Sequence, residues 1–373
     1  MKNTEKKDED LVKIVQPLVD WYRENKRDLP WRHNPDAYRV WISEIMLQQT
    51  RVEAVKGYYD RFLKALPTVK DLAEAEEDKL LKLWEGLGYY NRVRNMQKAA
   101  QQIMVDHEGI FPDTYEEILQ LKGIGNYTAG AISAFAYGIP KPAVDGNVLR
   151  VISRITGSYE DIMKQSVRKK IENTLEQVIP SDAASDFNQG LIELGAIVCV
   201  PNGEPKCEEC PVKEYCIACK ENLTTEIPVK KKAKARKIEE RTILIFKDGK
   251  RIAIRKRPAK GLLAGLYEFP NVEGHLRTEE VIGYAQTAGL TPVRVKRIGT
   301  AKHIFSHVEW HMTGYAVRVE EPEMQPQVQS KKIGTDGLLF VDAEDAKEKY
   351  AIPSAFAAYA KYMNILLGNE KNR

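Results

Sequence analysis

The chain has 373 residues, of which 29% are charged, with a formal net charge of +4 at pH 7. This length is too great for one ordinary hydrophobic core, so two domains are expected. The charge balance neither requires nor excludes nucleic acid. Because no apolar run approaches a membrane span and the first ten residues are polar, we expect a cytoplasmic protein without a secretory signal or a membrane partner.

The chain before Cys199 shows apolar residues at helical spacing, interrupted by short polar turns. Thr114 and Glu117 have the spacing of a capping box for one short helix. No strand pattern occurs in this part, which is predicted to be all-α. The other expected helices cover residues 11–22, 38–47, 52–63, 78–84, 92–104, 127–137, 148–155, 167–178 and 186–198.

A glycine hairpin lies between two of these predicted helices. Gly123 and Gly125 are spaced so that backbone N–H groups can approach a phosphate. A dinucleotide-binding fold is excluded because no strand precedes the hairpin and no third glycine follows at the required distance. The hairpin is followed by the predicted helix 127–137 and then by a loop. Asp145 comes after that loop, at the start of an apolar helical segment, where it is either a helix cap or a catalytic group.

All five cysteines lie in one short stretch, which favours a metal site over a disulfide framework. Four cysteine thiolates can bind either a zinc ion or an iron–sulfur cluster. The uneven gaps of seven, two and five residues favour a cluster, with Cys219 as a bystander or a substitute ligand. The expected ligands are Cys199, Cys207, Cys210 and Cys216.

The pattern changes after Cys219. Residues 223–238 are rich in lysine and are predicted to form a linker, either a solvated tether or one that follows phosphates. Strand patterns follow at 242–246, 252–256 and 312–319, and helical patterns at 279–288 and 354–367, the last capped by Ser354. We therefore predict a helical domain over 1–222, including the cysteine loop at 199–216, and an α+β domain over 239–373.

Several segments together resemble the MutY-type adenine DNA glycosylases (A/G-specific) of the helix–hairpin–helix endonuclease III superfamily. The first cysteine gap is seven residues where the family has six, and Lys122 stands where the superfamily often has proline. Besides the hairpin and the cysteine loop, the segments that carry the resemblance are 27–32, 42–50, 86–90, 144–147, 187–189 and 305–307.

The resemblance implies a multidomain protein with an all-α glycosylase domain, a four-cysteine iron–sulfur loop holding a [4Fe-4S] cluster, and an α+β Nudix-like domain. It also implies a monofunctional enzyme of base excision repair, which removes adenine mispaired with 8-oxoguanine or guanine in double-stranded DNA. A monomer associated with the nucleoid is expected. The Nudix hydrolase motif is absent around Arg277, so pyrophosphate hydrolysis is not expected.

Two carboxylates can divide the work of cleaving an N-glycosidic bond. Apolar neighbours should raise the pKa of Glu44 so that it stays protonated, unless it is a surface glutamate facing water. The resemblance implies that Glu44 protonates adenine at N7. An Asp145 cap should stay ionised, which is compatible with stabilising an oxocarbenium ion or acting as a transient nucleophile.

Tyr127 occupies the position at which bifunctional relatives carry a Schiff-base lysine. A phenol cannot form an imine, so no strand cleavage is expected. By resemblance, Tyr127 and Asn147 support Asp145 and the sugar; simple helix packing is the alternative for Tyr127.

The resemblance also assigns DNA contacts. The base must leave the duplex stack to be reached. The adenine pocket is formed by Arg27, Trp31, Arg32, Leu47 and Gln189, of which Trp31 and the arginines could instead form a cation–π cluster. Gly123 and Gly125 bind a phosphate. The residues that contact the opposing strand are Gln48, Gln49, Thr50, Leu87 and Tyr89.

The segment Phe305-Ser306-His307 is the expected reader of 8-oxoguanine, with Ser306 bonding the oxidised edge; ordinary turn residues are the alternative. Leu87 and Tyr89 could likewise fill a core. Two other functions remain open: a thymine or oxidised-pyrimidine glycosylase, and a non-catalytic DNA-binding protein stabilised by a metal.

Overall fold

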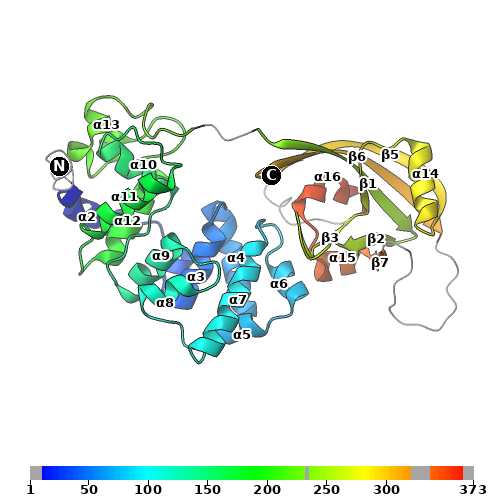
Figure 1. The fold of residues 1–373 in the computed structure, drawn as a ribbon, viewed down its shortest axis with the longest axis horizontal. Helices are drawn as coiled ribbons and strands as arrows, with labels where there is room; N and C mark the ends of the chain where they lie inside the picture. The colour runs from blue at the N-terminus through cyan, green and yellow to red at the C-terminus, as the bar shows by residue number, and fades with distance from the viewer. Residues whose placement is uncertain (1–10, 232–234, 321–336, 364–373) are drawn as a thin grey trace. The chain divides into compact units, whose positions relative to one another are not determined.

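The structure is a computed structural model, and it describes residues 11–231, 235–320 and 337–363 (Figure 1). The chain separates into two compact units. One unit combines the chain up to Ala75 with the stretch from Asn91 to the linker, and the other combines residues 76–90 with the C-terminal part. A short stretch within the helical half of the sequence thus packs with the C-terminal unit.

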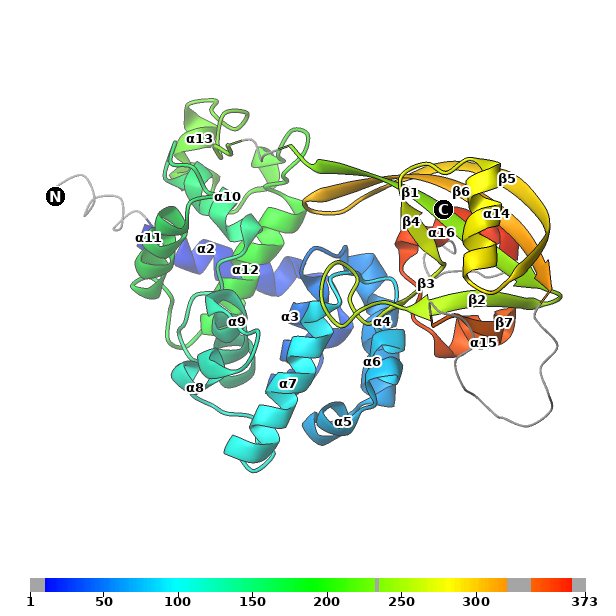
Figure 2. The same cartoon turned by 45° about the vertical axis from the view of Figure 1, so that its right-hand side comes forward.

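The first unit is all-helical, as predicted (Figure 2). The helices α5 and α13 were not predicted because they are too short to show a helical period. The unit contains α2 (Val15–Asn25), η1 (Pro30–Arg32), α3 (Ala37–Leu47), α4 (Val52–Ala65), α5 (Val69–Glu74), α7 (Asn91–Asp106), α8 (Tyr115–Gln120), α9 (Asn126–Tyr137), α10 (Gly146–Ile155), α11 (Gln165–Glu176), α12 (Ala184–Ile197), η2 (Cys207–Glu209), η3 (Lys213–Tyr215) and α13 (Ile217–Lys220).

Only half of the predicted capping box at Thr114 forms. The backbone N–H of Glu117 donates to the Thr114 hydroxyl, which caps α8. The Glu117 carboxylate accepts from the same hydroxyl at 2.6 Å instead of from the Thr114 backbone. The predicted box is therefore corrected to a simple threonine cap.

The core of the first unit gathers the apolar faces of α2, α10, α11 and α12. Leu18, Val148 and Phe187 are fully buried there. Helix α10 is buried along nearly its whole length, including the two arginines at Arg150 and Arg154. Because buried charges need partners, these arginines mark α10 as the helix that organises polar contacts inside the unit.

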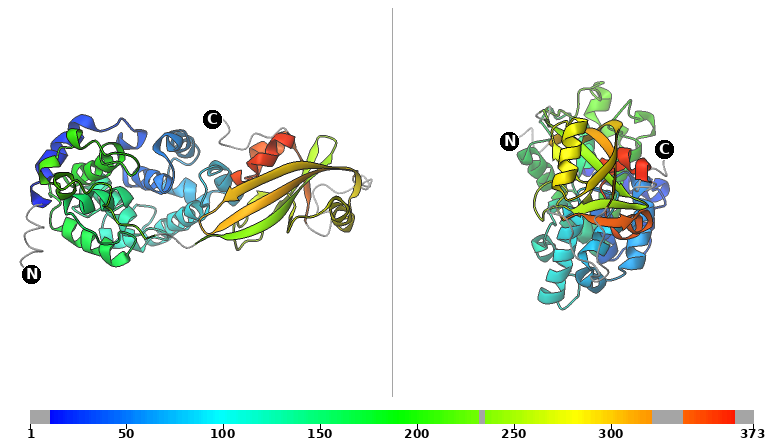
Figure 3. Two further views of the ribbon diagram at one scale, coloured as in Figure 1. Left: turned by 90° about the horizontal axis from the view of Figure 1, so that it is seen from above. Right: turned by 90° about the vertical axis from the view of Figure 1, so that its right-hand side faces the viewer.

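The second unit is built on a mixed sheet of seven strands in the order β3-β2-β1-β6-β5, with β4 paired to β1 and β7 to β2. Strands β1 and β6 are parallel and the other pairs are antiparallel; the long pair β5–β6 is seen in Figure 3. The strands are β1 (Lys237–Asp248), β2 (Arg251–Lys256), β3 (Tyr267–Glu268), β4 (Asn271–Glu273), β5 (Thr291–Ile304), β6 (Val308–Glu320) and β7 (Leu339–Asp342).

Alternation along β1 distributes its side chains to both faces of the sheet. Ile243 and Ile245 join one apolar cluster, with residues of η4 (Ser354–Phe356) and α16 (Ala357–Ala360). Leu244 and Phe246 join another, with residues of α14 (Thr278–Thr287). The unit is therefore α+β, as predicted, with α6 (Glu77–Leu83), α15 (Ala343–Lys349) and η5 (Lys361–Met363) completing it.

The predicted C-terminal helix is corrected within its described part. Ser354 lies inside the short η4, and Pro353 precedes it without a side-chain cap. The predicted helix also extended to 367, and residues 364–367 lie outside the described residues. Among the helices of the described ranges, none combines the length and the apolar character that crossing a bilayer requires.

Candidate active site

A cavity of about 590 Å³ lies in the helical unit, and its walls come from distant parts of the sequence. Helices α3, α9 and α12, the loop around η1 and the start of α10 all contribute to it. The cavity brings together twelve of the predicted site residues: Arg27, Trp31, Arg32, Glu44, Leu47, Gln48, Gln49, Thr50, Tyr127, Asp145, Asn147 and Gln189.

Glu44 is buried in the wall of this cavity, with 6% of its surface exposed. The alternative of a surface glutamate facing water is therefore excluded. Burial raises the pKa of Glu44 to about 7, and the charge of Asp145 acts in the same direction. The hydrogen bond from Tyr127 and the charge of Arg32 oppose that rise. Near neutral pH, Glu44 can both hold and release a proton.

The Tyr127 hydroxyl donates a hydrogen bond to the Glu44 carboxylate. Tyr127 lies near Asp145 as expected, since both line the cavity and the Asp145 charge acts on its pKa, but its hydrogen bond goes to Glu44. Burial and the charge of Glu44 raise the pKa of Tyr127 well above its ordinary value. The phenol therefore remains a hydrogen-bond donor throughout the neutral pH range.

Asp145 is the N-cap of α10. It accepts the backbone N–H groups of Asn147 and Val148, both at 2.8 Å, and the Asn147 amide at 2.7 Å. Burial raises the pKa of Asp145, and its three hydrogen-bond donors oppose that rise. The predicted helix cap is confirmed, and the ionised state of the carboxylate stays a prediction.

A chain of hydrogen bonds leads from Asp145 toward the cysteine loop. Arg150 donates from Nη2 to the Asn147 side-chain oxygen at 2.9 Å and from Nε to the Cys199 carbonyl at 2.8 Å. Arg154 donates to the Cys199 sulfur at 3.2 Å. Neither arginine was predicted from the sequence, although two charges four residues apart in an apolar helix are a detectable signal.

The predicted base pocket contains a carboxylate that was not predicted from the sequence. Glu193 of α12 has a fully buried side chain and forms ion pairs with Arg27 at 2.8 Å and Arg32 at 2.9 Å. These two arginines lower the pKa of Glu193 to about 2. The sequence did offer a signal for Glu193, which is an acid on an apolar helix, four residues after the predicted pocket residue Gln189. The amide oxygen of Gln189 accepts a hydrogen bond from Arg32 at 3.1 Å.

Trp31 is buried and packs edge-on against Tyr59, with ring centroids 5.6 Å apart. Arg32 makes its cation–π contact with another ring, that of Tyr22, whose centroid lies 5.4 Å from the guanidinium carbon. The alternative of a cluster between Trp31 and the arginines is thus corrected, since their guanidinium groups pair with Glu193.

The loop after α3 is held in an unusual backbone conformation. Gln49 has a φ of 60°, in the left-handed region that few non-glycine residues adopt. The Arg92 guanidinium donates to the carbonyls of Ile45 at 2.5 Å and Gln48 at 2.7 Å. A strained, anchored loop at the cavity rim suits a segment that contacts a ligand.

Leu87 and Tyr89 belong to the second unit. Leu87 is buried, with 6% exposure, whereas Tyr89 is 50% exposed and has a φ of 46°. The Tyr89 hydroxyl lies 3.0 Å from that of Ser306. Within this unit, a residue of the glycine-flanked loop and a residue of the predicted reader segment therefore share a hydrogen bond.

Phe305, Ser306 and His307 form the turn between β5 and β6. The Phe305 ring packs on Trp310 with centroids 4.9 Å apart, while Ser306 and His307 are exposed. The alternative that these three are turn residues is therefore confirmed as regards their place in the fold. Their exposure leaves the Ser306 and His307 side chains accessible to a ligand.

The glycine hairpin has the expected geometry. Gly123 has a φ of 79°, and a Cβ there would lie 2.6 Å from that of Asn95, so a larger residue does not fit. Gly125 is exposed and caps α9 without a side chain. The start of this twelve-residue helix is therefore open to an anion.

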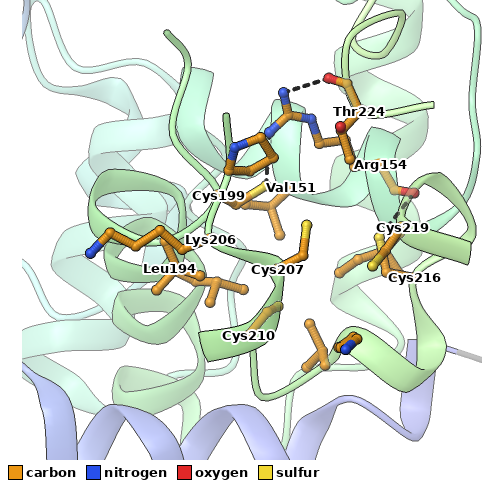
Figure 4. A pocket seen from close by; sticks show the side chains of 15 residues that line it. Val151, Arg154, Leu194, Cys199, Lys206, Cys207, Cys210, Cys216, Cys219 and Thr224 are labelled. Carbon is orange, nitrogen blue, oxygen red and sulfur yellow. Dashed lines mark hydrogen bonds between the residues drawn. The ribbon is translucent and has the colours of Figure 1, made fainter. Parts of the chain in front are cut away.

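The five cysteines line one pocket between α10, α12 and the loops after Cys199 (Figure 4). Burial raises the pKa of Cys207 to about 11 and that of Cys210 to about 12, with neighbouring thiols contributing to both shifts. No three potential ligands in the described ranges meet the geometry of a bound single metal ion. An iron–sulfur cluster needs four cysteine thiolates, and the five cysteines that line this pocket are enough to supply them.

Comparison with known proteins agrees with this arrangement. Residues 42–179 match the model of the HhH-GPD superfamily of base excision DNA repair proteins, and residues 241–362 match that of the NUDIX domain. An adenine DNA glycosylase of Buchnera aphidicola subsp. Acyrthosiphon pisum (strain APS) is 36% identical over 307 residues, covering 82% of this chain and 86% of that protein. The one from Mus musculus is 34% identical over 370 residues, covering 84% and 72%.

A solved structure of a thermostable thymine-DNA glycosylase is also similar, with a TM-score of 0.52 and 30% identity over 58% of this chain and 99% of that one. The predicted family and fold class are confirmed. This chain, with a helical HhH-GPD domain followed by a Nudix-like domain, belongs to the adenine DNA glycosylase family of base excision repair enzymes.

Proposed function

We propose that the protein is a monofunctional glycosylase that removes adenine mispaired with 8-oxoguanine or guanine from double-stranded DNA. The observation that supports this most is the pairing of two carboxylates in one cavity: the buried Glu44, with a pKa of about 7, and the partly buried Asp145, held by three N–H donors. Adenine excision needs a proton donor for the base and a negative charge for the sugar.

In this mechanism the flipped adenine enters the cavity and Glu44 protonates it at N7. Protonation turns the base into a neutral leaving group. Arg27, Trp31, Arg32, Leu47 and Gln189 surround the base, since all of them line the same cavity.

Asp145 stabilises the oxocarbenium ion that forms as the base leaves. Its two backbone donors and the Asn147 amide fix the direction of its oxygens. Water then completes the hydrolysis. The Tyr127 hydroxyl donates a hydrogen bond to Glu44. Because Tyr127 has no amine, it forms no imine with the sugar and the strand stays intact.

The remaining assignments concern DNA contacts. We assign Gly123 and Gly125 to a backbone phosphate, and the exposed turn of Phe305, Ser306 and His307 to the oxidised base. The segments that contact the strand opposite adenine are Gln48, Gln49, Thr50, Leu87 and Tyr89. Of these, Leu87 would have to leave its buried position to reach the duplex.

The cysteine pocket is proposed to hold a [4Fe-4S] cluster on Cys199, Cys207, Cys210 and Cys216, with Cys219 as a neighbour. These four cysteines would hold the cluster, and its bonds to their sulfurs would hold the loop from Cys199 to Cys216 in place. The chain's own contribution is the hydrogen bonding of Arg150 and Arg154 to Cys199, which ties this loop to the helix capped by Asp145.

We further propose that residues 1–222 act as the catalytic domain, 223–238 as a linker and 239–373 as the domain that recognises the base opposite adenine. The protein is expected to work as a monomer in the nucleoid-containing cytoplasm.

Product analysis on defined duplexes tests the proposal. The full chain is incubated with A:8-oxoguanine, A:G, T:G and thymine-glycol duplexes, and products are examined with and without alkali. We expect adenine release from the first two, with strand breaks only after alkali. The similarity to a thymine-DNA glycosylase makes T:G the informative competitor. Base release only from T:G or thymine glycol, or binding without any release, contradicts the proposal.

A further inference from the structure

Glu193 lies behind the base pocket on α12, with its side chain fully buried. Arg27 donates to this carboxylate three times: from the backbone N at 2.9 Å, from Nε at 2.8 Å and from Nη2 at 2.8 Å. Such a planar, two-pronged contact fixes the guanidinium in direction as well as in place.

The same carboxylate also holds Arg32. That guanidinium donates to Glu193 from Nη2 at 2.9 Å and from Nη1 at 3.3 Å. It reaches the Arg27 carbonyl at 2.9 Å and the Gln189 amide oxygen at 3.1 Å, and Gln189 in turn accepts from Tyr22 at 2.8 Å. One buried acid is thus the common acceptor for two arginines that line the cavity.

We propose that Glu193 is a positioning residue for base excision: it holds Arg27 and Arg32 in the orientation that receives adenine and offsets their charge beside Glu44. This inference rests on the proposed function. Glu193 itself touches neither the base nor the sugar in this role and acts through the two arginines.

The negative charge of Glu193 influences the ionisation of Glu44, an effect that the packing of its side chain alone would not have. The groups that act on Glu44 are Tyr127 from α9, Asp145 at the start of α10 and Arg32 from η1. Arg27, Arg168 and Glu193 are the other charged residues in the cavity wall. Without the Glu193 charge, Arg32 is no longer compensated, so the ionised form of Glu44 becomes more favourable.

Glu193→Gln tests this because it removes the charge and keeps the shape. Single-turnover adenine release from an A:8-oxoguanine duplex is measured across the neutral pH range. We expect a rate at least about tenfold lower and an alkaline midpoint about half a pH unit lower than in the wild type. Glu193→Asp keeps the charge with a shorter reach, so its midpoint should stay at the wild-type value while its rate falls.

Glu268→Gln is the matched control. Glu268 is another buried glutamate held by two arginines, Arg255 at 2.9 Å and Arg257, but it lies in the second unit. We expect it to lower the melting temperature without moving the pH midpoint.

A wild-type midpoint in Glu193→Gln, or an equal shift in Glu268→Gln, overturns the inference. If Glu193→Gln does not fold, a wild-type rate in Glu193→Asp overturns it instead. A wild-type protein that releases no adenine contradicts the proposed function and is seen before any variant is compared.

Discussion

The Tyr127 hydroxyl donates a hydrogen bond to the Glu44 carboxylate, and both groups are enclosed by the same cavity. A hydrogen bond to the ionised form lowers a carboxyl pKa, so Tyr127 restrains the rise that burial imposes on Glu44. Tyr127 therefore keeps the pKa of the proposed acid close to neutral pH.

Glu44→Gln should lower single-turnover adenine release by roughly 10²–10⁴-fold, because the proton donor is lost. In the wild type, Glu44 is active when protonated, so the rate should be full below its pKa and fall as pH rises through about 7. DNA binding should persist in the variant. A variant that retains wild-type activity below neutral pH, where Glu44 of the wild type is protonated, contradicts this role.

The raised pKa of Glu44 also affects stability. The folded state binds a proton more tightly than the unfolded state, whose carboxyl has an ordinary pKa of 4.5. The free energy of unfolding should therefore decrease as pH rises from that value to about 7. Urea titrations of wild type and Glu44→Gln measure the difference; equal pH dependence in both would argue against a buried, titrating Glu44.

Tyr127→Phe removes the hydrogen bond and keeps the ring. Since hydrogen bonds to charged groups contribute about 1.5–3 kcal/mol, the alkaline midpoint of the rate should move upward by about one to two pH units. The shift is opposite in sign to that expected for Glu193→Gln. A pH–rate profile under single-turnover conditions measures it, and an unchanged midpoint would mean that Tyr127 only packs.

Asn147→Ala removes an amide that donates to Asp145 and accepts from Arg150. The Asp145 carboxylate loses one of its three donors, so the rate should fall roughly 10–100-fold with little change in DNA affinity. Rates and binding are measured on the same duplex. Equal losses in affinity and rate would assign Asn147 to binding.

Ser306→Ala should narrow the preference for 8-oxoguanine over guanine opposite adenine, because it removes the hydroxyl next to Tyr89. The ratio of kcat/KM for the two duplexes reports this. Tyr89→Phe is the companion variant, since it keeps the ring and removes the shared hydrogen bond. If the ratio is the same as in the wild type for Ser306→Ala, the reading role lies elsewhere.

The purified protein should be brown with broad visible absorbance, and removal of iron should destabilise the loop from Cys199 to Cys216. Cys219→Ser should keep the colour, whereas Cys210→Ser should lose it. A colourless protein that contains zinc would contradict the cluster assignment.

The sequence predicted the long helices well because their apolar period is unbroken over several turns, as in α3 and α12. Most of the cavity residues that were predicted came from the family resemblance and not from a pattern in the sequence. Glu193 and Arg150 were missed because a buried ion pair depends on where distant helices meet, and a periodic pattern carries no such information. The burial that raises the pKa of Asp145 is likewise not visible from a cap motif.

The stretch from Glu76 to Tyr90 packs with the C-terminal unit, where Lys82 donates to the Tyr350 carbonyl and Glu85 accepts the backbone N–H of Ile352. The polypeptide therefore crosses between the two units three times. A protein shortened at the linker would retain α6 and the Leu87–Tyr89 loop but lose the residues that they pack against. Studies of such a fragment would measure a damaged N-terminal part, and its defects should not be attributed to the absence of the C-terminal unit alone.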